Sequence, residues 1–305
     1  MALPPLRPTW TVKPGPDAAA VQGLAASLQL PAALCRLLAV RGQDTPEQAK
    51  SFLRPLIDEL HPPELLTDVD VAGDRIGRAI DRGERILVHG DYDVDGISGA
   101  ALLEGWIRRL GGKVEAFVPH RLRDGYDLGA AGVSRATELG AGLLVTVDCG
   151  IRAHDWVERA QDSGVDVIVT DHHRPSDTLP PALAVVNPNR VDCLYPNKSL
   201  CGAAVAFKLC QWLGKAAGVS EEELWPQLDL VAMATVADQV PLTDENRALV
   251  RFGLKALAQG TRPGLNALIR AANLRRRVDA TTIAYVLAPR INAAGRVGET
   301  EAALR

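Results

Sequence analysis

The sequence predicts an α/β fold, in which a mostly parallel sheet has helices on both faces and is flanked by helical N- and C-terminal segments. Two observations predict it. From residue 85 onward, short apolar runs rich in β-branched residues alternate with amphipathic stretches of helical length. Several of these runs end in Asp or His, and in such folds ligands bind outside the carboxyl ends of the strands.

The N-terminal part of the chain, residues 1–80, is expected to be a helical segment packed on the core. Helices are predicted at 18–28 and 32–40, and a third begins after Thr45. Thr45 can cap a helix that has Pro46 at its first position and Gln48 three residues after the cap. Pro62-Pro63 is expected to end this stretch before a further helix at 71–82.

The middle of the chain, residues 81–241, is expected to form the metal-binding α/β domain. Its apolar runs predict strands, and the stretches between them predict helices that connect the strands in parallel. The predicted strands are 86–88, 114–118, 143–147, 167–170 and 184–186, and the predicted helices are 98–110, 131–139, 153–163, 202–212 and 221–236.

The last part, residues 242–305, is expected to be helical, with breaks at Gly260, Pro263-Gly264 and Pro289. Residues 299–305 resemble the opening of a helix without a Gly or Pro stop. We therefore expect the sequence to be a piece of a longer protein.

Bulk composition limits the classes of function. No apolar run approaches the roughly 18 residues of a membrane span, so we expect no membrane partner and a cytoplasmic location. Five cysteines without a C-x-x-C pair argue against a disulfide framework and a zinc knuckle. With a net charge of -3, a polyanionic partner must be bound by a local basic patch.

Three carboxylates follow the first predicted strand at alternate positions, Asp91, Asp93 and Asp95. Like charges this close repel one another unless a cation neutralises them, so the triplet suggests a metal site. A solvated acidic turn is the plain alternative. A calcium loop does not fit, because Leu102 occupies the position of its terminal Glu and a strand precedes it.

Two further predicted strands deliver metal-ligating residues to the same edge: Asp148 after the third strand and Asp171-His172-His173 after the fourth. Carboxylates with imidazoles suit Mg²⁺ or Mn²⁺, and the histidines favour Mn²⁺. Two such ions about 3.5–4 Å apart can hydrolyse phosphoesters, with Asp148 as the expected bridge. Adjacent histidines alternate in direction, so one should ligate while the other faces substrate.

Four motifs of the sequence resemble those of the DHH phosphoesterase superfamily. They are Asp91-x-Asp93-x-Asp95-Gly96, Asp148-Cys149-Gly150, Asp171-His172-His173 and Asp238. The segments 186–188, 200–208 and 289–296 are similar to the RecJ branch, which comprises 5′-to-3′ exonucleases acting on single-stranded DNA. The resemblance runs from about residue 41 to the end. RecJ proteins continue into a second lobe, and we expect 242–305 to lead towards it.

The resemblance implies a role for each motif residue. Metal ligands are implied at Asp93, Asp95, Asp148, His172 and Asp238, for two Mn²⁺ or Mg²⁺ ions. His173 is implied to lie close to the scissile phosphate, and Asp91 is placed with it among the catalytic residues, as an orienting carboxylate or alternate ligand. His89 precedes Asp93 by four residues, a spacing similar to the superfamily's pyrophosphatases; a metal ligand and a histidine that only orients a neighbour both remain open.

Two segments resemble substrate-binding parts of the family. In 119–126, Arg121 is implied to bind a 5′-phosphate and Tyr126 to stack on a base, although Asp127 stands where Gly is expected; an exposed polar loop is the alternative. Arg290, Asn292 and Arg296 resemble the segment over the active site. A helix-capping Asn between surface arginines is the other interpretation of that segment.

The leading hypothesis is a metal-dependent exonuclease that releases 5′-mononucleotides from single-stranded DNA in repair and recombination, with a single-strand-binding protein and a helicase as expected partners. The second is a phosphoesterase of short oligonucleotides, cyclic dinucleotides or pyrophosphate. The third is a catalytically silent scaffold in replication. The haloacid-dehalogenase plan fits poorly, because it needs Ser or Thr where Pro119-His120-Arg121 stands.

Overall fold

The structure, a computed structural model, describes residues 11, 15–297 and 300–304. The opening of the predicted N-terminal segment and Glu299, where the last helix is expected to start, lie outside the described residues. The chain divides into two compact units, Met1–Leu56 and Ile57–Arg305. Each unit is described by itself.

The first unit contains three helices, α1 (Ala18–Leu28), α2 (Ala32–Val40) and α3 (Pro46–Leu53). The predicted cap of α3 is confirmed, because the Thr45 side chain accepts a hydrogen bond from the Gln48 backbone and the Gln48 side chain accepts one from the Thr45 backbone. Leu24, Cys35 and Leu38 are buried in a small core of this unit.

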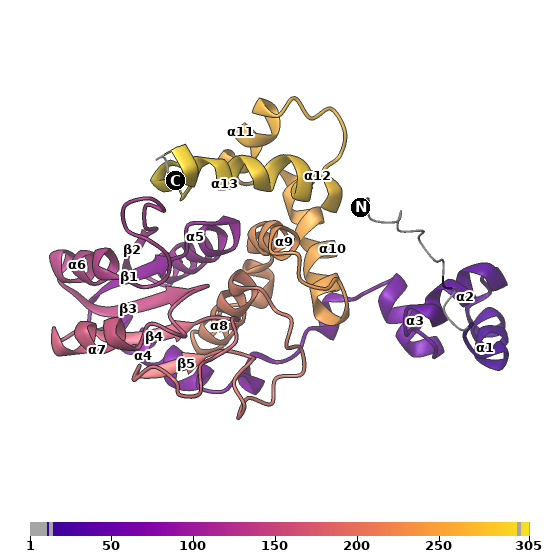
Figure 1. Cartoon of the computed structure of the whole chain (residues 1–305), viewed down its shortest axis with the longest axis horizontal. Helices are drawn as coiled ribbons and strands as arrows, with labels where there is room; N and C mark the ends of the chain where they lie inside the picture. Colours follow the sequence, from indigo (N-terminus) through magenta and orange to yellow (C-terminus); the bar gives the residue numbers. More distant parts are fainter. Residues whose placement is uncertain (1–10, 12–14, 298–299, 305) are drawn as a thin grey trace, which may run out of the picture. The chain divides into compact units, whose positions relative to one another are not determined.

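The second unit contains a five-stranded sheet in the order β2-β1-β3-β4-β5, and every strand pair is parallel (Figure 1). The strands are β1 (Arg85–Gly90), β2 (Lys113–Phe117), β3 (Ala141–Val147), β4 (Asp166–Thr170) and β5 (Ala184–Val186). The predicted α/β fold is therefore confirmed. Gly90 pairs with Val147, and Val147 pairs with Thr170, so β1, β3 and β4 end level with one another.

Helices cover both faces of the sheet, as the apolar strands require. One face packs against α6 (Ala130–Leu139) and α7 (His154–Asp162). The other face packs against α4 (Val69–Asp81), α5 (Val94–Arg109) and α8 (Gly202–Ala216), where Trp106 and Phe207 are fully buried.

The remainder of the second unit is helical. Short 3₁₀ turns occur at η1 (Ile57–Glu59), η2 (Pro63–Leu65), η3 (Glu221–Glu223) and η4 (Trp225–Gln227). The other elements are α9 (Leu228–Ala237), α10 (Asp244–Gln259), α11 (Pro263–Ala271), α12 (Ala280–Thr282), the π-helix η5 (Ile283–Leu287), α13 (Ala288–Val297) and α14 (Thr300–Leu304).

Four predicted boundaries are wrong, one of them the end of α8, which continues to Ala216 rather than ending at 212. Helix α5 begins at Val94 rather than at 98, because the Asp93 side chain accepts the backbone N–H groups of Asp95 and Gly96. The helix expected at 221–236 is two 3₁₀ turns before α9, with Pro226 in the second turn. Pro289 does not break the chain's helical course, because it lies in the first turn of α13, directly after the π-helix.

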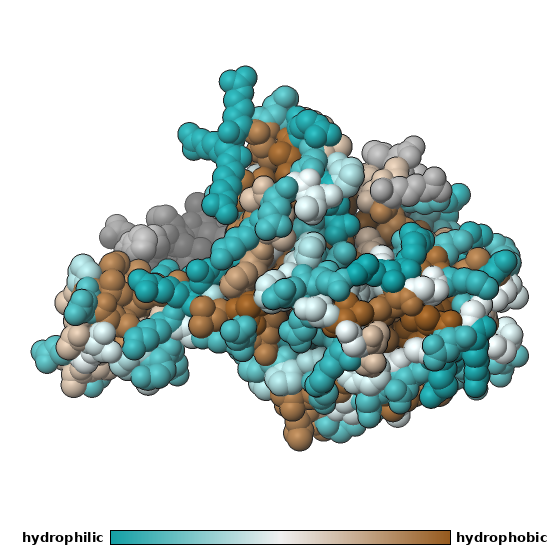
Figure 2. Space-filling model, turned by 180° about the vertical axis from the view of Figure 1, so that it is seen from behind, coloured by the Kyte–Doolittle hydropathy of each residue, from teal (hydrophilic) through white to brown (hydrophobic). Residues whose placement is uncertain are grey.

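None of the helices in the described part of the chain is long and apolar enough to cross a membrane. Figure 2 shows one face of the molecule, where hydrophobic residues occur in patches between hydrophilic ones.

Candidate metal centre

The carboxyl ends of β1, β3 and β4 bring three motifs together, because parallel strands in register end at one edge of the sheet. The backbone continues the pairing beyond the strands: Asp91 N–H donates to Val147 O at 3.2 Å, and Asp148 N–H donates to Thr170 O at 3.0 Å. These backbone hydrogen bonds fix the segments after the three strands relative to one another.

The acidic triplet after β1 divides among three environments. Asp91 directly follows β1 and is buried, and Asp93 caps α5. Asp95 is buried and accepts backbone N–H groups of Gly202 at 2.6 Å and Ala203 at 2.7 Å, at the N-terminus of α8. The helix dipole and these donors hold the Asp95 carboxylate in place.

Asp148 follows β3 with a positive φ of 64°, a backbone conformation that favours glycine. A Cβ atom added at Gly202 would come within 2.5 Å of the Asp148 Cβ, so only glycine lets α8 begin this close to the carboxylate. The backbone strain and the tight approach both serve to place one buried acid at the centre of the edge.

The two histidines after β4 lie side by side, with ring centroids 4.5 Å apart. His172 directs Nε2 to within 3.1 Å of Asp148 Oδ1 and 3.8 Å of Asp238 Oδ2. His173 Nδ1 lies 2.8 Å from Asp171 Oδ1, which fixes its ring and leaves Nε2 towards the groove, 3.4 Å from the Tyr126 hydroxyl.

Three groups of these side chains place their ligand atoms close enough to hold a cation. The groups are Asp148–His172–His173, Asp95–His172–Asp238 and Asp91–Asp93–Asp148, each with its ligand atoms within 4.8 Å of one another. Asp148 and His172 each belong to two groups. This sharing is what a site for two neighbouring ions requires.

Unsatisfied atoms point to the same conclusion. Asp91 Oδ1, Asp148 Oδ1 and His172 Nε2 are buried without a hydrogen-bond partner among the described residues. His172 Nε2 is near Asp148 Oδ1, but the two atoms do not meet at hydrogen-bond angles. A buried polar atom without a partner costs about 1–3 kcal/mol, so three of them in one place fit a donor set arranged around a cation.

The electrostatics of the metal-free edge are unfavourable. Burial, reinforced by Asp93, raises the pKa of Asp91 to about 7. Burial, reinforced by Asp95, raises the pKa of Asp238 to about 6 and that of Asp148 well above its usual range. Carboxyl groups that resist ionisation in this way would be ionised by a bound divalent cation.

A groove of about 300 Å³ opens at this edge. Its lining combines the acidic edge with cationic, aromatic and amide side chains: Asp91, Tyr92, Asp93, Arg121, Tyr126, Asp148, His173, Asp238, Asn292 and Arg296. The groove thus has an anionic floor and a rim able to bind phosphate and stack on bases.

Two predicted site residues lie elsewhere. The His89 ring packs edge-on against Phe117 and against Gly132 of α6, outside the three ligand groups. Burial lowers its pKa to about 4. Arg290 is exposed and donates to Val286 O. Asn292 lines the groove and accepts the Val94 N–H at the start of α5, and its contact with substrate stays a prediction.

Sequence reasoning missed Tyr92, which packs edge-on against Tyr126 and lies under the Arg121 guanidinium, 4.8 Å from its ring centroid. The position of Tyr92 between Asp91 and Asp93 was the signal that could have pointed to it. Asp171 was placed at this edge, but its role was not predicted: it orients His173. Although burial alone raises the pKa of Asp171, the hydrogen bond from His173 brings that pKa below its ordinary value.

Comparison with known proteins agrees with this geometry. The family model described as "DHH family, N-terminal domain" matches residues 85–235. The single-stranded-DNA-specific exonuclease RecJ of Dickeya dadantii is 41% identical over 283 residues, which cover 88% of this chain and 48% of that protein. RecJ of Bacillus subtilis is 37% identical over 296 residues, 97% of this chain and 37% of its own length. The chain therefore spans less than half the length of these two relatives.

Solved structures give the same result. A crystal structure of exonuclease RecJ bound to manganese matches with a TM-score of 0.73 and 40% identity, over 82% of this chain and 62% of that one. RecJ of Thermus thermophilus in complex with Mn²⁺ matches with a TM-score of 0.81 and 36% identity, over 95% of this chain and 41% of that one. The chain belongs to the DHH family, and within it resembles the RecJ exonucleases.

Proposed function

We propose that this chain is the catalytic part of a metal-dependent exonuclease that releases 5′-mononucleotides from single-stranded DNA. The observation that carries the proposal is the set of buried ligand atoms of Asp91, Asp148 and His172 at one strand edge, which have no hydrogen-bond partner within the described chain. The similarity to RecJ proteins, whose names state action on single-stranded DNA, supports the substrate.

The residues present fit two ions of Mn²⁺ or Mg²⁺. Asp93, Asp95, Asp148, His172 and Asp238 would hold them, with Asp148 between the two ions. Such ions would activate the attacking water and stabilise the leaving oxygen of the phosphodiester. His89 as a ligand stays a prediction, because its ring is directed to α6.

The chain's own side chains would position the substrate. Arg121 at the groove rim can bind a terminal phosphate through paired N–H donors, and Tyr126 beside it can stack on a base. Arg296 and Asn292 face the same groove from α13 and can contact further phosphates. His173 Nε2 can donate to a phosphate oxygen, because hydrogen bonding to Asp171 raises the His173 pKa and favours the imidazolium.

The cellular setting follows from the same proposal. An exonuclease of single strands would act in repair and recombination in the cytoplasm, on strands exposed by a helicase and covered by a single-strand-binding protein. Arg290, exposed beside the groove-lining segment of α13, would contact DNA beyond the terminal nucleotides.

The test is a time course with long substrates of one sequence that carry a 5′-phosphate, single-stranded or blunt duplex, in Mn²⁺, Mg²⁺ or chelator. We expect 5′-mononucleotides from the single strand, no product in chelator and little from the duplex. Release from the 3′ end, or equal rates on both substrates, would contradict the proposal.

A dinucleotide taken from the same sequence serves as the length control. Faster turnover of the dinucleotide than of the long strand would replace the proposal with a phosphoesterase of short substrates. A chain that binds Mn²⁺ but hydrolyses neither substrate would instead indicate a silent scaffold.

A further inference from the structure

Asp127 lies directly after Tyr126 and has a φ of 72°, a conformation that favours glycine. The hydrogen bonds of the Asp127 carboxylate explain why an acid occupies a position of positive φ. Asp127 Oδ1 accepts the backbone N–H of Gly150 at 2.6 Å and that of Leu128 at 2.8 Å. The charge is therefore directed away from the groove's phosphate-binding rim and into the backbone of a neighbouring turn.

The acceptor contact joins two separate parts of the site. Gly150 is two residues beyond Asp148, in the turn that follows β3. Tyr126 and Arg121 belong to the loop between β2 and α6. The bond from Gly150 to Asp127 is thus a direct link between the turn of a predicted metal ligand and the loop of the predicted substrate contacts.

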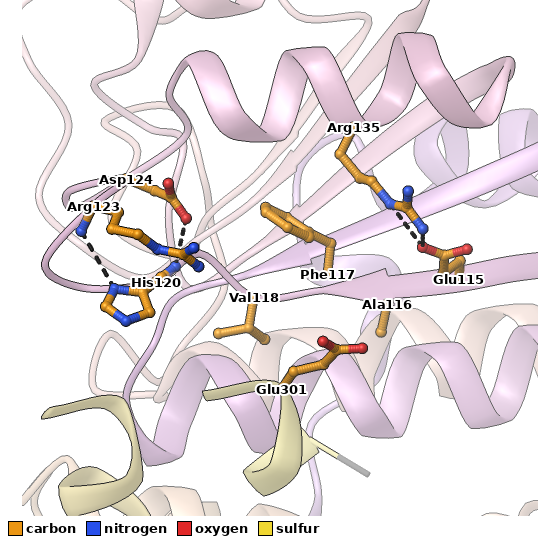
Figure 3. Close-up of a pocket in the computed structure, with 9 residues that line it drawn as sticks. All are labelled: Glu115, Ala116, Phe117, Val118, His120, Arg123, Asp124, Arg135 and Glu301. Atoms are coloured by element: carbon orange, nitrogen blue, oxygen red, sulfur yellow. Dashed lines mark hydrogen bonds and ion pairs between the residues drawn. The ribbon is translucent and has the colours of Figure 1, made fainter. Parts of the chain in front are cut away.

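Other residues of this loop are braced by hydrogen bonds among themselves and line a second pocket instead of the groove. Figure 3 shows His120, Arg123 and Asp124 in a second pocket beside β2, with the dashed bonds among them. The Asp124 carboxylate accepts the His120 N–H at 2.8 Å, and His120 Nδ1 accepts the Arg123 N–H at 3.3 Å. The loop is therefore folded upon itself, and its link across to the β3 turn is made by Asp127.

We propose that Asp127 is a positioning residue, which holds Tyr126 and Arg121 at the groove by accepting the Gly150 N–H. The inference rests on the proposed function, because it assigns Asp127 to substrate binding at that same site. Glycine at this position would keep the backbone conformation but would leave the buried Gly150 N–H without its acceptor.

The experiment compares Asp127→Gly with Asp127→Asn in the full chain. Both residues tolerate a positive φ, but only Asn retains a side-chain oxygen that can accept the Gly150 N–H. Asp177→Gly removes an exposed loop acid elsewhere and serves as the matched control. Steady-state kinetics use a 5′-phosphorylated single strand in Mn²⁺, and hydrogen exchange reports on the Gly150 amide.

We expect Asp127→Gly to raise KM about tenfold, the effect of losing one hydrogen bond to a charged acceptor, while kcat changes less than about twofold. The Gly150 amide should exchange faster in this variant. Asp127→Asn should restore most of both properties, and Asp177→Gly should match the unmodified chain.

An unchanged KM in Asp127→Gly, or a defect in Asp127→Asn equal to that of Asp127→Gly, would overturn the inference while the unmodified chain still degrades DNA. A loss of kcat as large as the change in KM, together with reduced Mn²⁺ binding, would also overturn it, by making Asp127 a support of the metal edge. If the unmodified chain neither binds nor cleaves the strand, the proposed function fails first and the inference falls with it.

Discussion

Compared with the acidic edge of the sheet, the buried ion pair between α8 and α10 shows how this protein satisfies a buried charge without a ligand. Lys208 and Glu245 are fully buried, with Nζ 2.8 Å from Oε2. Lys208 also donates to His61 O, and Glu245 accepts the Tyr195 hydroxyl at 2.7 Å. Each charge in this pair has an opposite partner and a further hydrogen bond.

The acidic edge differs in two respects: its ionisable side chains are mostly carboxyl groups, and some of their buried oxygens accept no hydrogen bond from the described residues. Asp91 and Asp148 face other carboxylates, and each has a buried oxygen without a hydrogen-bond partner in the part of the chain that the structure describes. Buried charges of one sign are stable only when an opposite charge accompanies them. The Lys208 pair is therefore balanced within the protein, whereas the carboxylates of the acidic edge need a bound cation to balance their charge.

Substitution of Asp148 by Asn tests the comparison with the largest expected effect. We expect metal-dependent hydrolysis to fall by at least about 10³-fold, since the proposed shared ligand of the two ions would be lost. The metal-free chain should unfold at the same temperature or higher, because one mutually repelling carboxylate is removed. Nuclease rates and thermal melts in chelator measure the two effects. Retained activity with contaminants excluded would refute the bridging role.

Substitution of Lys208 by Met should instead lower the stability and leave metal binding unchanged. Leaving Glu245 buried without its partner should lower the free energy of unfolding by about 3–5 kcal/mol. The folded fraction should still bind Mn²⁺. Urea unfolding followed by circular dichroism gives the stability change, and the double variant Lys208→Met/Glu245→Leu should recover much of it. A Lys208→Met chain of full stability would show that the pair contributes little.

The pH dependence of stability should also distinguish the edge. A carboxyl group with a raised pKa binds more protons in the folded chain than in the unfolded chain, so its contribution to stability falls as pH rises. Asp91, with a pKa of about 7, should lower the stability of the metal-free chain between about pH 4 and 7. His89, with its lowered pKa, acts in the opposite direction.

The contribution of Asp91 to the pH dependence is therefore measured as the difference in stability between the unmodified chain and Asp91→Asn, from thermal melts at a series of pH values. Mn²⁺ should remove the difference, because the ion replaces the protons. An Asp91→Asn chain whose stability changes with pH as that of the unmodified chain does would contradict the raised pKa of Asp91.

The smallest effect is expected at Tyr92, which lies under Arg121 at the rim. Tyr92→Leu should raise KM by roughly twofold to fivefold, the size of one partly exposed cation–π contact, while Tyr92→Phe should remain near the original value. Steady-state kinetics on a single-stranded substrate measure the KM of both variants. A large kcat loss in Tyr92→Leu would place the residue in the metal edge rather than at the rim.

The sheet could be predicted because its signal is local. Short, mostly apolar runs marked all five strands, and Thr45 with Gln48 marked a helix start from four adjacent residues. The wrong boundaries arose where neighbouring structure overrides propensity. Asp93 starts α5 early by capping it, and the π-helix before Pro289 continues the chain through a residue that usually breaks helices.

The acids and histidines of the edge could likewise be placed together, because parallel strands in register share one end. What the sequence could not show is which way a side chain turns. His89 has the spacing of a ligand but packs against α6, and Asp127, which stands where Gly is expected, accepts the Gly150 N–H. Such outcomes depend on contacts between residues distant in sequence.

The most direct test of the account is a calorimetric titration of the chelator-treated chain with Mn²⁺ at slightly alkaline pH. We predict two bound ions per chain, a raised melting temperature, and loss of at least one ion in Asp148→Asn, with both retained in Lys208→Met at a temperature where it is folded. Absence of Mn²⁺ binding, or equal binding by Asp148→Asn and the unmodified chain, would contradict it.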